Sequence, residues 1–548
     1  MSDIYDAIVI GGGVNGTGLV RDLTRRGFRV ALFEKGDFAR GATGNSSGMI
    51  HGGARYLLND TGTTKHSCVD SGYVQNIAKH LLFRIPFLVP VLRENSFGPL
   101  GPLLYDVYFK CYDRYAAAKR GIPHARLKVD EMLALEPGLK GDFIGGVTTD
   151  EFGIDTARLC LLNALDAEAQ GAEIYTYATV TGFKRDNSGA ISGVTVQHAR
   201  GGVKDYQAKT VINCAGAWAE ALAGSVGGGF RIRPGKGVHL VFDRRLTHFS
   251  VVTDAVDGRQ VFIMPYMNET WIGTTDDDFY GDLDNMQATH DEVEYLLTAI
   301  ERIIPSIRAQ RMIGIRIGVR NTIHAWGPSE DDLSRSYEVV DHQGLGAKNL
   351  FSVIGGKLAS FRQQAEDAAD AVSKHLGRVS QCDTHLHALP GADGDVDPEE
   401  LCRAYPQISP LAARRLIGRH GTLAWKVLEL GKETPSGFEV IEPYEPVLEC
   451  ELRWVIRNEH VHHLRDLSAR VRLGMGADLG LQSVRRAGRI YASERGLSVP
   501  DERAEVARFI QERWSTLPPT LGKMQNLQAQ FNRQHWTRWL GQEALGGF

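Results

Sequence analysis

Three glycines and one glutamate near the start of the chain have the types and spacing that bind a dinucleotide. Gly11, Gly13 and Gly16 form a G-x-G-x-x-G pattern, and Glu34 lies 18 residues beyond the last of them. The first glycine permits a tight turn, the second lets a pyrophosphate approach the backbone, and the third allows a helix to pack closely on a strand. A carboxylate at the position of Glu34 accepts hydrogen bonds from ribose hydroxyls. This pattern predicts FAD or NAD as the ligand and disfavours a 2′-phosphate.

The residues around these glycines predict the elements that position them. Residues 7–10 are a short apolar run, which is typical of a buried parallel strand. Residues 17–26 predict a helix that Gly27 ends, and residues 28–33 predict a second strand. In such a strand–helix–strand unit the N-terminus of the helix faces the pyrophosphate.

Three later turns distinguish FAD from NAD. Residues 39–47 are a small, hydroxyl-rich loop, a strand over 211–214 ends in a small-residue turn, and a strand over 350–354 runs into a double glycine. The chain resembles the FAD-dependent glycerol-3-phosphate dehydrogenase family in these turns. The resemblance runs from about residue 5 to 375 and also includes 271–276 and 318–320. It implies bound FAD, with contacts from Thr43, Ser46, Ser47, Ala215, Gly216, Gly355, Gly356 and Lys357.

The fold class that follows is α/β with a helical C-terminal part. We expect a Rossmann-like, discontinuous FAD-binding domain and a mixed-sheet cap domain over the substrate. Residues 390–398 are rich in proline, glycine and aspartate and predict a linker. The predicted domains are 1–80, 145–235 and 340–378 for FAD, 81–144 and 236–339 for the substrate or cap region, and 390–548 for the helical domain.

The resemblance implies a three-carbon polyol phosphate that is oxidised at its secondary alcohol. Such a substrate needs an anion clamp, a base for the hydroxyl proton and a hydride acceptor, which is the flavin. Arg55 and Tyr56 match the family pattern H-G-G-x-R-Y-L, and Arg320 matches G-V-R. These residues and Arg335 are the predicted substrate-binding set, because a planar guanidinium matches phosphate oxygens.

The predicted catalytic residues are His239, Arg320 and Lys357. His239 lies in an apolar strand and matches a histidine of the aerobic-type enzymes of the family. An imidazole suits removal of a hydroxyl proton near neutral pH. Lys357 follows the double glycine at a helix start, where a cation stabilises negative charge on the reduced flavin ring.

The leading functional hypothesis is oxidation of sn-glycerol 3-phosphate with electrons passed to a quinone. Alternatives are a dehydrogenase for another polyol phosphate, such as a four-carbon one, an oxidase that makes hydrogen peroxide, and a non-catalytic flavoprotein that docks a redox partner protein. Asn321 replaces the proline that many members carry after G-V-R, and Gly48 replaces a common lysine. These changes flank the substrate pocket and keep the longer polyol phosphate open.

The C-terminal part resembles the tail of the anaerobic-type large subunit, which carries a four-cysteine iron–sulfur site. Here Cys450 is retained, and the other three positions appear as Leu448, Asp478 and Ser483. One thiolate cannot hold a cluster that needs about four cysteines. We expect no metal, and a degenerate domain kept for packing or docking.

The composition of the chain narrows the classes of protein and partner that remain possible. The 548 residues include 62 lysines and arginines against 66 acids, a net charge of −4, which argues against a nucleic-acid partner. Seven scattered cysteines without a CxxC pair indicate a reduced cytosol, and the N-terminus predicts no signal peptide. No apolar run approaches a spanning length. The apolar stretches 80–93 and 100–120 fit either core packing or a peripheral contact with the inner face of the cell membrane.

Overall fold

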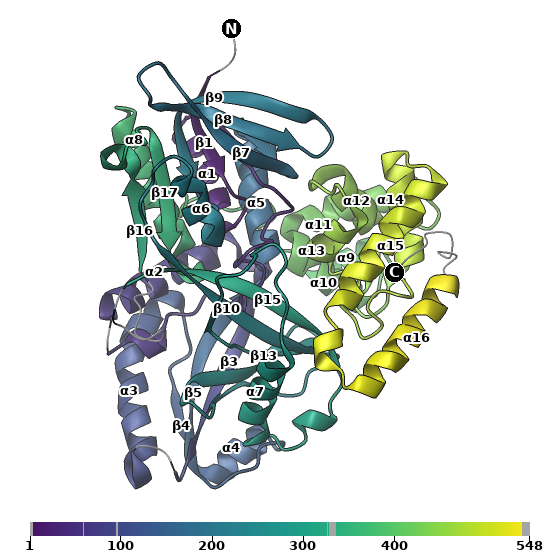
Figure 1. The fold of residues 1–548 in the computed structure, drawn as a ribbon. Helices are drawn as coiled ribbons and strands as arrows, with labels where there is room; N and C mark the ends of the chain where they lie inside the picture. Colours follow the sequence, from purple (N-terminus) through teal and green to yellow (C-terminus); the bar gives the residue numbers. More distant parts are fainter. Residues whose placement is uncertain (1–3, 59, 95–96, 326, 328–335, 540–548) are drawn as a thin grey trace.

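The strand–helix–strand unit at the N-terminus begins the first of two large sheets (Figure 1). The computed structural model describes residues 4–58, 60–94, 97–325, 327 and 336–539. Strand β1 (Tyr5–Ile10) leads into helix α1 (Val14–Arg25), which returns to β2 (Val30–Phe33). β1 pairs in parallel with β2 and with β9 (Gly202–Asn213), so the unit lies at the centre of its sheet.

The first sheet has the order β16-β17-β9-β1-β2-β6, and β7 and β8 extend it as an antiparallel ribbon on β9. Helix α1 packs against α5 and α8, and its apolar residues join one core with those of both helices. Apart from the strands already given, the elements of this layer are β6 (Glu173–Tyr175), β7 (Ala178–Arg185), β8 (Ile191–His198), β16 (Tyr337–Asp341), β17 (Leu350–Gly355), α2 (Thr61–Ile77), α5 (Thr156–Glu168), α6 (Ala219–Gly224) and α8 (Phe361–His375).

The second sheet lies below the first in Figure 1 and is the mixed-sheet domain expected over the substrate. Its order is β14-β10-β13-β12-β11-β3-β5-β4, with β15 paired to β10. Helix α7 packs its apolar face on this sheet and closes a second core. The elements are β3 (Leu82–Leu92), β4 (Ala125–Leu127), β5 (Phe143–Ile154), β10 (Ile232–Phe242), β11 (Ser250–Asp254), β12 (Gln260–Tyr266), β13 (Glu269–Gly273), β14 (Asp277–Asp278), β15 (Met312–Ile323), α3 (Gly101–Ala116), α4 (Val129–Leu135) and α7 (His290–Glu301).

The boundaries between the two sheets differ from the expected ones by a few residues at β10 and β16, and by more at β5. The second FAD-binding segment was expected to start at residue 145, but β5 stays in the second sheet as far as Ile154. The reason is its antiparallel register with β3, which pairs Leu82 with Ile154 and continues to Leu92 with Phe143. The chain returns to the first layer only with α5.

The two apolar stretches between residues 80 and 120 form different elements and differ in burial. The first forms β3, inside the second sheet between β11 and β5. On α3 the apolar face divides: Phe109 and Tyr112 are buried on the sheet side, whereas Leu103, Leu104 and Val107 are exposed. Tyr112 turns inward and donates a hydrogen bond to Glu151, so this part of the 100–120 stretch belongs to the core. Among the described residues, no helix is long and apolar enough to cross a membrane.

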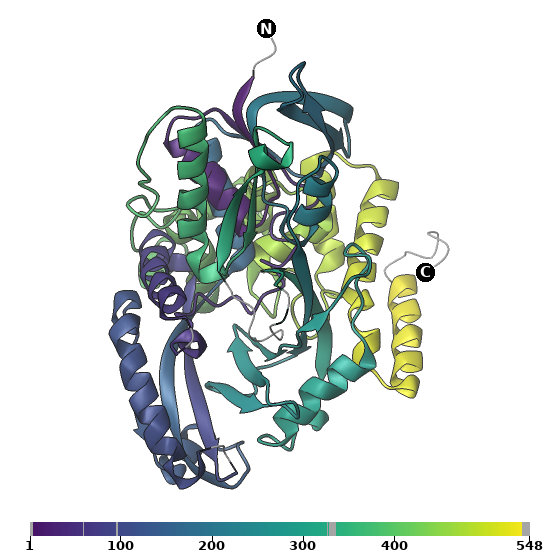
Figure 2. The same cartoon turned by 60° about the vertical axis from the view of Figure 1, so that its left-hand side comes forward.

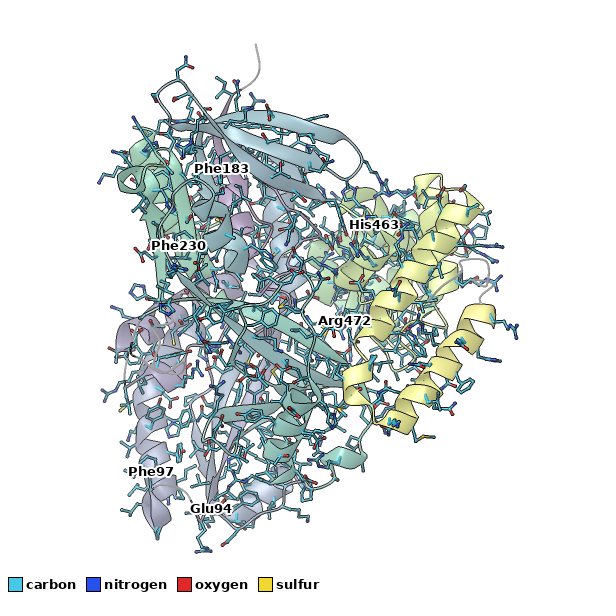
Figure 3. All side chains as sticks on the ribbon, in the orientation of Figure 1. Glu94, Phe97, Phe183, Phe230, His463 and Arg472 are labelled. Carbon is cyan, nitrogen blue, oxygen red and sulfur yellow. The ribbon has the colours of Figure 1, made fainter. Side chains whose placement is uncertain are left out.

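The C-terminal domain lies beside both sheets, as the two turned views show (Figures 1 and 2). It is helical apart from the short pair β18 and β19. Buried ion pairs join it to the rest: Arg158 on α5 contacts Glu459, and Arg472 contacts Glu269 on β13. Figure 3 shows Arg472 at the boundary between the helices and the sheets. The elements are α9 (Pro398–Ala404), α10 (Pro410–His420), α11 (Ala424–Leu430), β18 (Val440–Glu442), β19 (Val447–Leu448), α12 (Glu449–Asn458), α13 (Leu467–Val471), α14 (Val484–Arg495), α15 (Val499–Ser515) and α16 (Lys523–Trp539).

The positions that align with cluster cysteines have structural partners of their own. Ser483 donates a 2.7 Å hydrogen bond to Glu442, and Asp478 accepts the backbone N–H groups of Gly480 and Gln482. Cys450 is buried in an apolar cluster, and burial raises the pKa of its thiol to about 12. In the part of the chain that the structure describes, no group of three or more His, Cys, Asp or Glu side chains could hold a metal ion.

Candidate active site

A large cavity lies where the two sheets meet and has a volume of about 2220 Å³. It brings together residues that are far apart in the sequence. Gly16 lies behind its wall, and Arg335 lies outside the described residues. All other predicted site residues line it: Gly11, Gly13, Glu34, Thr43, Ser46, Ser47, Arg55, Tyr56, Ala215, Gly216, His239, Arg320, Gly355, Gly356 and Lys357.

The three motif glycines have three different local environments. Gly11 has φ +112°, and an added Cβ would lie 2.5 Å from the carbonyl oxygen of Cys214. At Gly16 a Cβ would lie 1.9 Å from the carbonyl oxygen of Gly11. Gly13 has an ordinary φ of −75°, and its Cβ would meet only the Thr43 hydroxyl, at 3.3 Å. Gly11 and Gly16 therefore serve the fold, while Gly13 leaves room on the cavity side at the start of α1.

The start of α1 and the end of β2 fit the two polar parts of a dinucleotide. α1 has no acidic residue in its first turn, so the positive end of its dipole is left for a pyrophosphate. Glu34 accepts hydrogen bonds from the backbone N–H of Gly12 at 2.6 Å and of Gly36 at 2.7 Å. Burial raises the pKa of this carboxyl, although the two N–H donors act in the opposite direction. A carboxylate has about four lone-pair positions, so two remain for ribose hydroxyls.

The hydroxyl-rich loop is fixed to both neighbouring layers. Thr43 accepts the N–H of Val14 at 3.2 Å, which ties the loop to the first turn of α1. Ser46 donates to the carbonyl of Thr43 at 2.8 Å and accepts the N–H of Gly48 at 3.2 Å. Ser47 differs from both, because its hydroxyl lies 2.9 Å from Nε2 of His239 on β10. The loop thus links the cofactor end of the cavity to the predicted base.

His239 is 2% exposed and lies between strands β13 and β15. Burial, with the positive charges of Arg316 and Arg320, lowers the pKa of its imidazole to about 3. The ring is therefore neutral at pH 7 and can accept a proton. Neutral imidazole is the state that a general base requires.

Arg320 reaches the cavity from β15 and is 31% exposed. Its guanidinium lies 3.2 Å from a carboxylate oxygen of Asp276 and donates to the hydroxyl of Thr274. Asp276 is shared with Arg233, which contacts the same oxygen at 2.8 Å. Arg233 also pairs with Asp278, so two arginines and two carboxylates form one network, from which Arg320 faces the cavity.

Tyr56 is the centre of a second cationic group. The ammonium of Lys357 lies 3.3 Å from the centroid of the Tyr56 ring, and the guanidinium of Arg55 lies 4.7 Å from it. Gly355 and Gly356 both have positive φ, +72° and +85°, which permits the turn that delivers Lys357 to this place. Lys357 and Arg55, 302 positions apart in the chain, therefore flank one aromatic ring.

Three lining residues were missed by sequence reasoning. His51 accepts the N–H of Gly53 at 3.0 Å, and burial together with Lys357 and Arg55 lowers its pKa to about 3. It belongs to the same H-G-G-x-R-Y-L segment as Arg55, so that segment was a signal for it. Asn15 donates to Gln364 at 3.0 Å, and Gln364 donates to the carbonyl of Lys357 at 2.7 Å. Asn15 and Gln364 are 349 positions apart, so no local sequence pattern indicates their contact.

Comparisons with known proteins agree with this geometry. Residues 6–360 match the FAD dependent oxidoreductase family, and residues 382–501 match the C-terminal domain of alpha-glycerophosphate oxidase. The chain is 30% identical over 552 residues to an anaerobic glycerol-3-phosphate dehydrogenase subunit from Escherichia coli strain K12, covering 100% of this chain and 97% of that protein. It is 29% identical over 524 residues to glycerol-3-phosphate dehydrogenase 2 of Mycobacterium tuberculosis, covering 92% and 87%.

A solved structure gives the same result. The glycerol-3-phosphate dehydrogenase of Bacillus halodurans, complexed with FAD, superposes with a TM-score of 0.76 at 25% identity, over 95% of this chain and 96% of that one. The fold and the cavity thus define an FAD-dependent oxidoreductase. Within this class the chain belongs to the FAD-dependent glycerol-3-phosphate dehydrogenase family, and its cofactor is FAD. The sequence predictions of family, fold class and cofactor are confirmed.

The difference among the glycines leads to a prediction at Gly13. We expect Gly13→Val to fold but to purify without flavin absorbance, because its side chain fits the backbone and enters the space of the pyrophosphate. The measurements are the ratio of flavin to protein absorbance and the circular dichroism spectrum. Gly138→Val is the control, since Gly138 is exposed and an added Cβ meets nothing within 4 Å. A fully loaded Gly13→Val protein would contradict the placement.

Proposed function

We propose that the protein oxidises sn-glycerol 3-phosphate to dihydroxyacetone phosphate and passes the electrons to a quinone. The observation that carries this proposal is the joint presence of Arg55, Lys357 and Arg320 with the neutral His239 in the cavity of the predicted flavin turns. An anion clamp, a base and a cofactor site are the three requirements of this reaction. Their convergence also disfavours a non-catalytic docking protein.

The cationic side chains bind and orient the substrate in this proposal. In the proposal, the guanidinium of Arg320 binds the substrate through charge-assisted hydrogen bonds and holds its reacting carbon in place. Arg55 and Lys357 add positive charge from the opposite layer, where Tyr56 restricts both side chains. In the proposal, bound FAD and substrate displace water from between the two sheets, which strengthens each of these interactions.

His239 accepts the hydroxyl proton of the substrate in this proposal. FAD, when bound, supplies the acceptor for the hydride that leaves C2 of the substrate. The hydroxyl proton on that carbon moves to Nε2 of His239, whose present partner is the Ser47 hydroxyl at 2.9 Å. The C2–H and O–H bonds break, the carbonyl forms, and the imidazole becomes charged. The Ser47 hydroxyl occupies Nε2 before the substrate binds and leaves this nitrogen when the proton is transferred.

A quinone acceptor suits the outer face of α3. Leu58, Phe97, Leu104 and Val107 are exposed and also line the outer part of the cavity. In the proposal, this face rests on the inner surface of the cell membrane, where a lipid-soluble acceptor can reach the site. The protein is then cytoplasmic and peripheral, and reoxidation by oxygen is the alternative to exclude.

Flavin bleaching tests the function directly. Anaerobic holoenzyme is mixed with sn-glycerol 3-phosphate, a four-carbon polyol phosphate and unphosphorylated glycerol, and the flavin absorbance is followed. We expect rapid bleaching by the first compound, and fast reoxidation by a soluble quinone but slow peroxide formation in air. Preference for the four-carbon compound would reassign the substrate. Absence of bleaching by any compound would refute the catalytic proposal.

Arg320→Lys tests the clamp. The substitution keeps one charge but loses the planar fork, and a lost hydrogen bond to a charged group costs about 1.5–3 kcal/mol. We expect kcat/KM to fall roughly ten- to over a hundredfold, while flavin content stays normal. The measurement is steady-state kinetics with an artificial acceptor. Normal efficiency would mean that Arg320 only pairs with Asp276, for which lysine substitutes.

His239→Gln tests the base. Glutamine can still bond to Ser47, but it cannot accept the proton, so we expect kcat to fall by about 10²–10⁴ with flavin retained. In the unmodified protein the pKa near 3 keeps His239 neutral as the pH falls through 6.5. Its kcat should therefore show no acid limb near pH 6.5. A limb at that pH that disappears in His239→Gln would contradict the neutral-histidine assignment.

A further inference from the structure

The C-terminal domain contributes a side chain to the cofactor end of the cavity. Arg465, in the short turn Leu464–Asp466 before α13, lines the cavity on the same side as Arg40 of the hydroxyl-rich loop. Phe33, Lys35 and Gly36, the chain neighbours of Glu34, also line the cavity, as does Thr179 on β7. Since Glu34 is the carboxylate expected at the ribose, this end of the cavity is assigned to the adenosine part of FAD.

Arg465 is held in place by two partners. Glu512 on α15 contacts Arg40 at 2.8 Å with one carboxylate oxygen and Arg465 at 3.4 Å with the other. The ring of Tyr177 lies 5.8 Å below the guanidinium of Arg465. Glu512 therefore bridges cations from two domains across the mouth of this end of the cavity.

Arg470, five residues after Arg465, contacts the turn that follows Glu34. Arg470 pairs with Asp37 through two parallel hydrogen bonds of 2.6 and 2.9 Å, and both side chains are almost fully buried. Three residues after Glu34 the chain is thus fixed by a bidentate contact from the other domain. A buried pair of this kind is strongly destabilised when one partner is lost.

A second contact fixes the neighbouring strand. Tyr177, directly before β7, donates a 2.5 Å hydrogen bond to Asp466 and a backbone N–H bond of 3.0 Å to Gly36. β7 then supplies cavity residues, and its first residue, Ala178, donates to the carbonyl of Glu34 at 2.8 Å. The segment 465–470 therefore contacts both backbone stretches that surround the predicted ribose position.

We propose that the C-terminal domain completes the FAD site, with Arg465 as a direct contact to the adenosine part and Arg470 as a positioning residue for the Glu34 turn. A planar, weakly hydrated guanidinium suits stacking on a purine. The proposal depends on FAD as cofactor and is independent of the substrate. It makes FAD binding and docking of the C-terminal domain thermodynamically linked, since each stabilises the form that the other needs.

Ligand affinity of the apoprotein tests this, with no activity measurement. FAD binding is followed by quenching of flavin fluorescence, and ADP binding by calorimetry. We expect Arg465→Ala to weaken FAD and ADP by the same factor, about five- to fiftyfold, and to leave riboflavin 5′-phosphate binding unchanged. Arg508→Ala is the matched control, because Arg508 is an exposed arginine of the same domain that pairs with Glu505 and lies off the cavity.

A second variant guards against a folding defect. Glu512→Gln removes the carboxylate that bridges Arg40 and Arg465, at a half-exposed position that should tolerate the change. We expect a smaller loss of FAD and ADP affinity in the same direction. Equal affinity of Arg465→Ala, Glu512→Gln, Arg508→Ala and the unmodified protein for ADP would overturn the proposal. Loss of riboflavin 5′-phosphate binding to the same extent as ADP would also overturn it, because the effect would then not belong to the adenosine end.

Discussion

The contact between Gly16 and the carbonyl oxygen of Gly11 determines where everything else in the site can lie. It lets the start of α1 touch the turn that follows β1, because an added Cβ would come within 1.9 Å of that oxygen. With the helix so close, the ends of the parallel strands β1, β2, β9 and β17 open on one edge of the sheet. Glu34, Ala215 and Gly355 stand at or directly after those strand ends. A ligand that spans this edge therefore meets residues from four separate parts of the chain.

The second constraint is the positive charge of the cavity. Arg55, Lys357, Arg316 and Arg320 lie close enough to the two cavity histidines to help hold their pKa values near 3. A further positive charge in such surroundings is unfavourable, so His239 is neutral before any proton transfer. The same field favours a ligand that brings negative charge, and it acts more strongly in a site from which water is excluded. The substrate we propose would supply such a charge through its phosphate.

The sequence predicted features that depend on a few neighbouring residues. Features that depend on pairing between distant parts of the chain could not be predicted. The motif glycines, Glu34 and the double glycine at 355–356 could be found because each turn needs particular residue types over a few positions. The end of β5 escaped because its register is set by β3, about sixty residues earlier. Helical periodicity on α3 identified apolar positions but could not tell which side Tyr112 faces, since its partner Glu151 lies on another strand. The same holds for Ser47, whose link to His239 spans 192 positions.

Contacts of the C-terminal domain reach the turn that carries Glu34. At two positions where the resemblance places cluster cysteines, Ser483 donates to Glu442 and Asp478 accepts backbone N–H groups, so hydrogen bonds within the chain hold these turns. The bidentate pair between Arg470 and Asp37 connects this domain to the turn of Glu34, because Asp37 lies three residues after Glu34. The position of this domain and the geometry of the Glu34 turn therefore depend on each other.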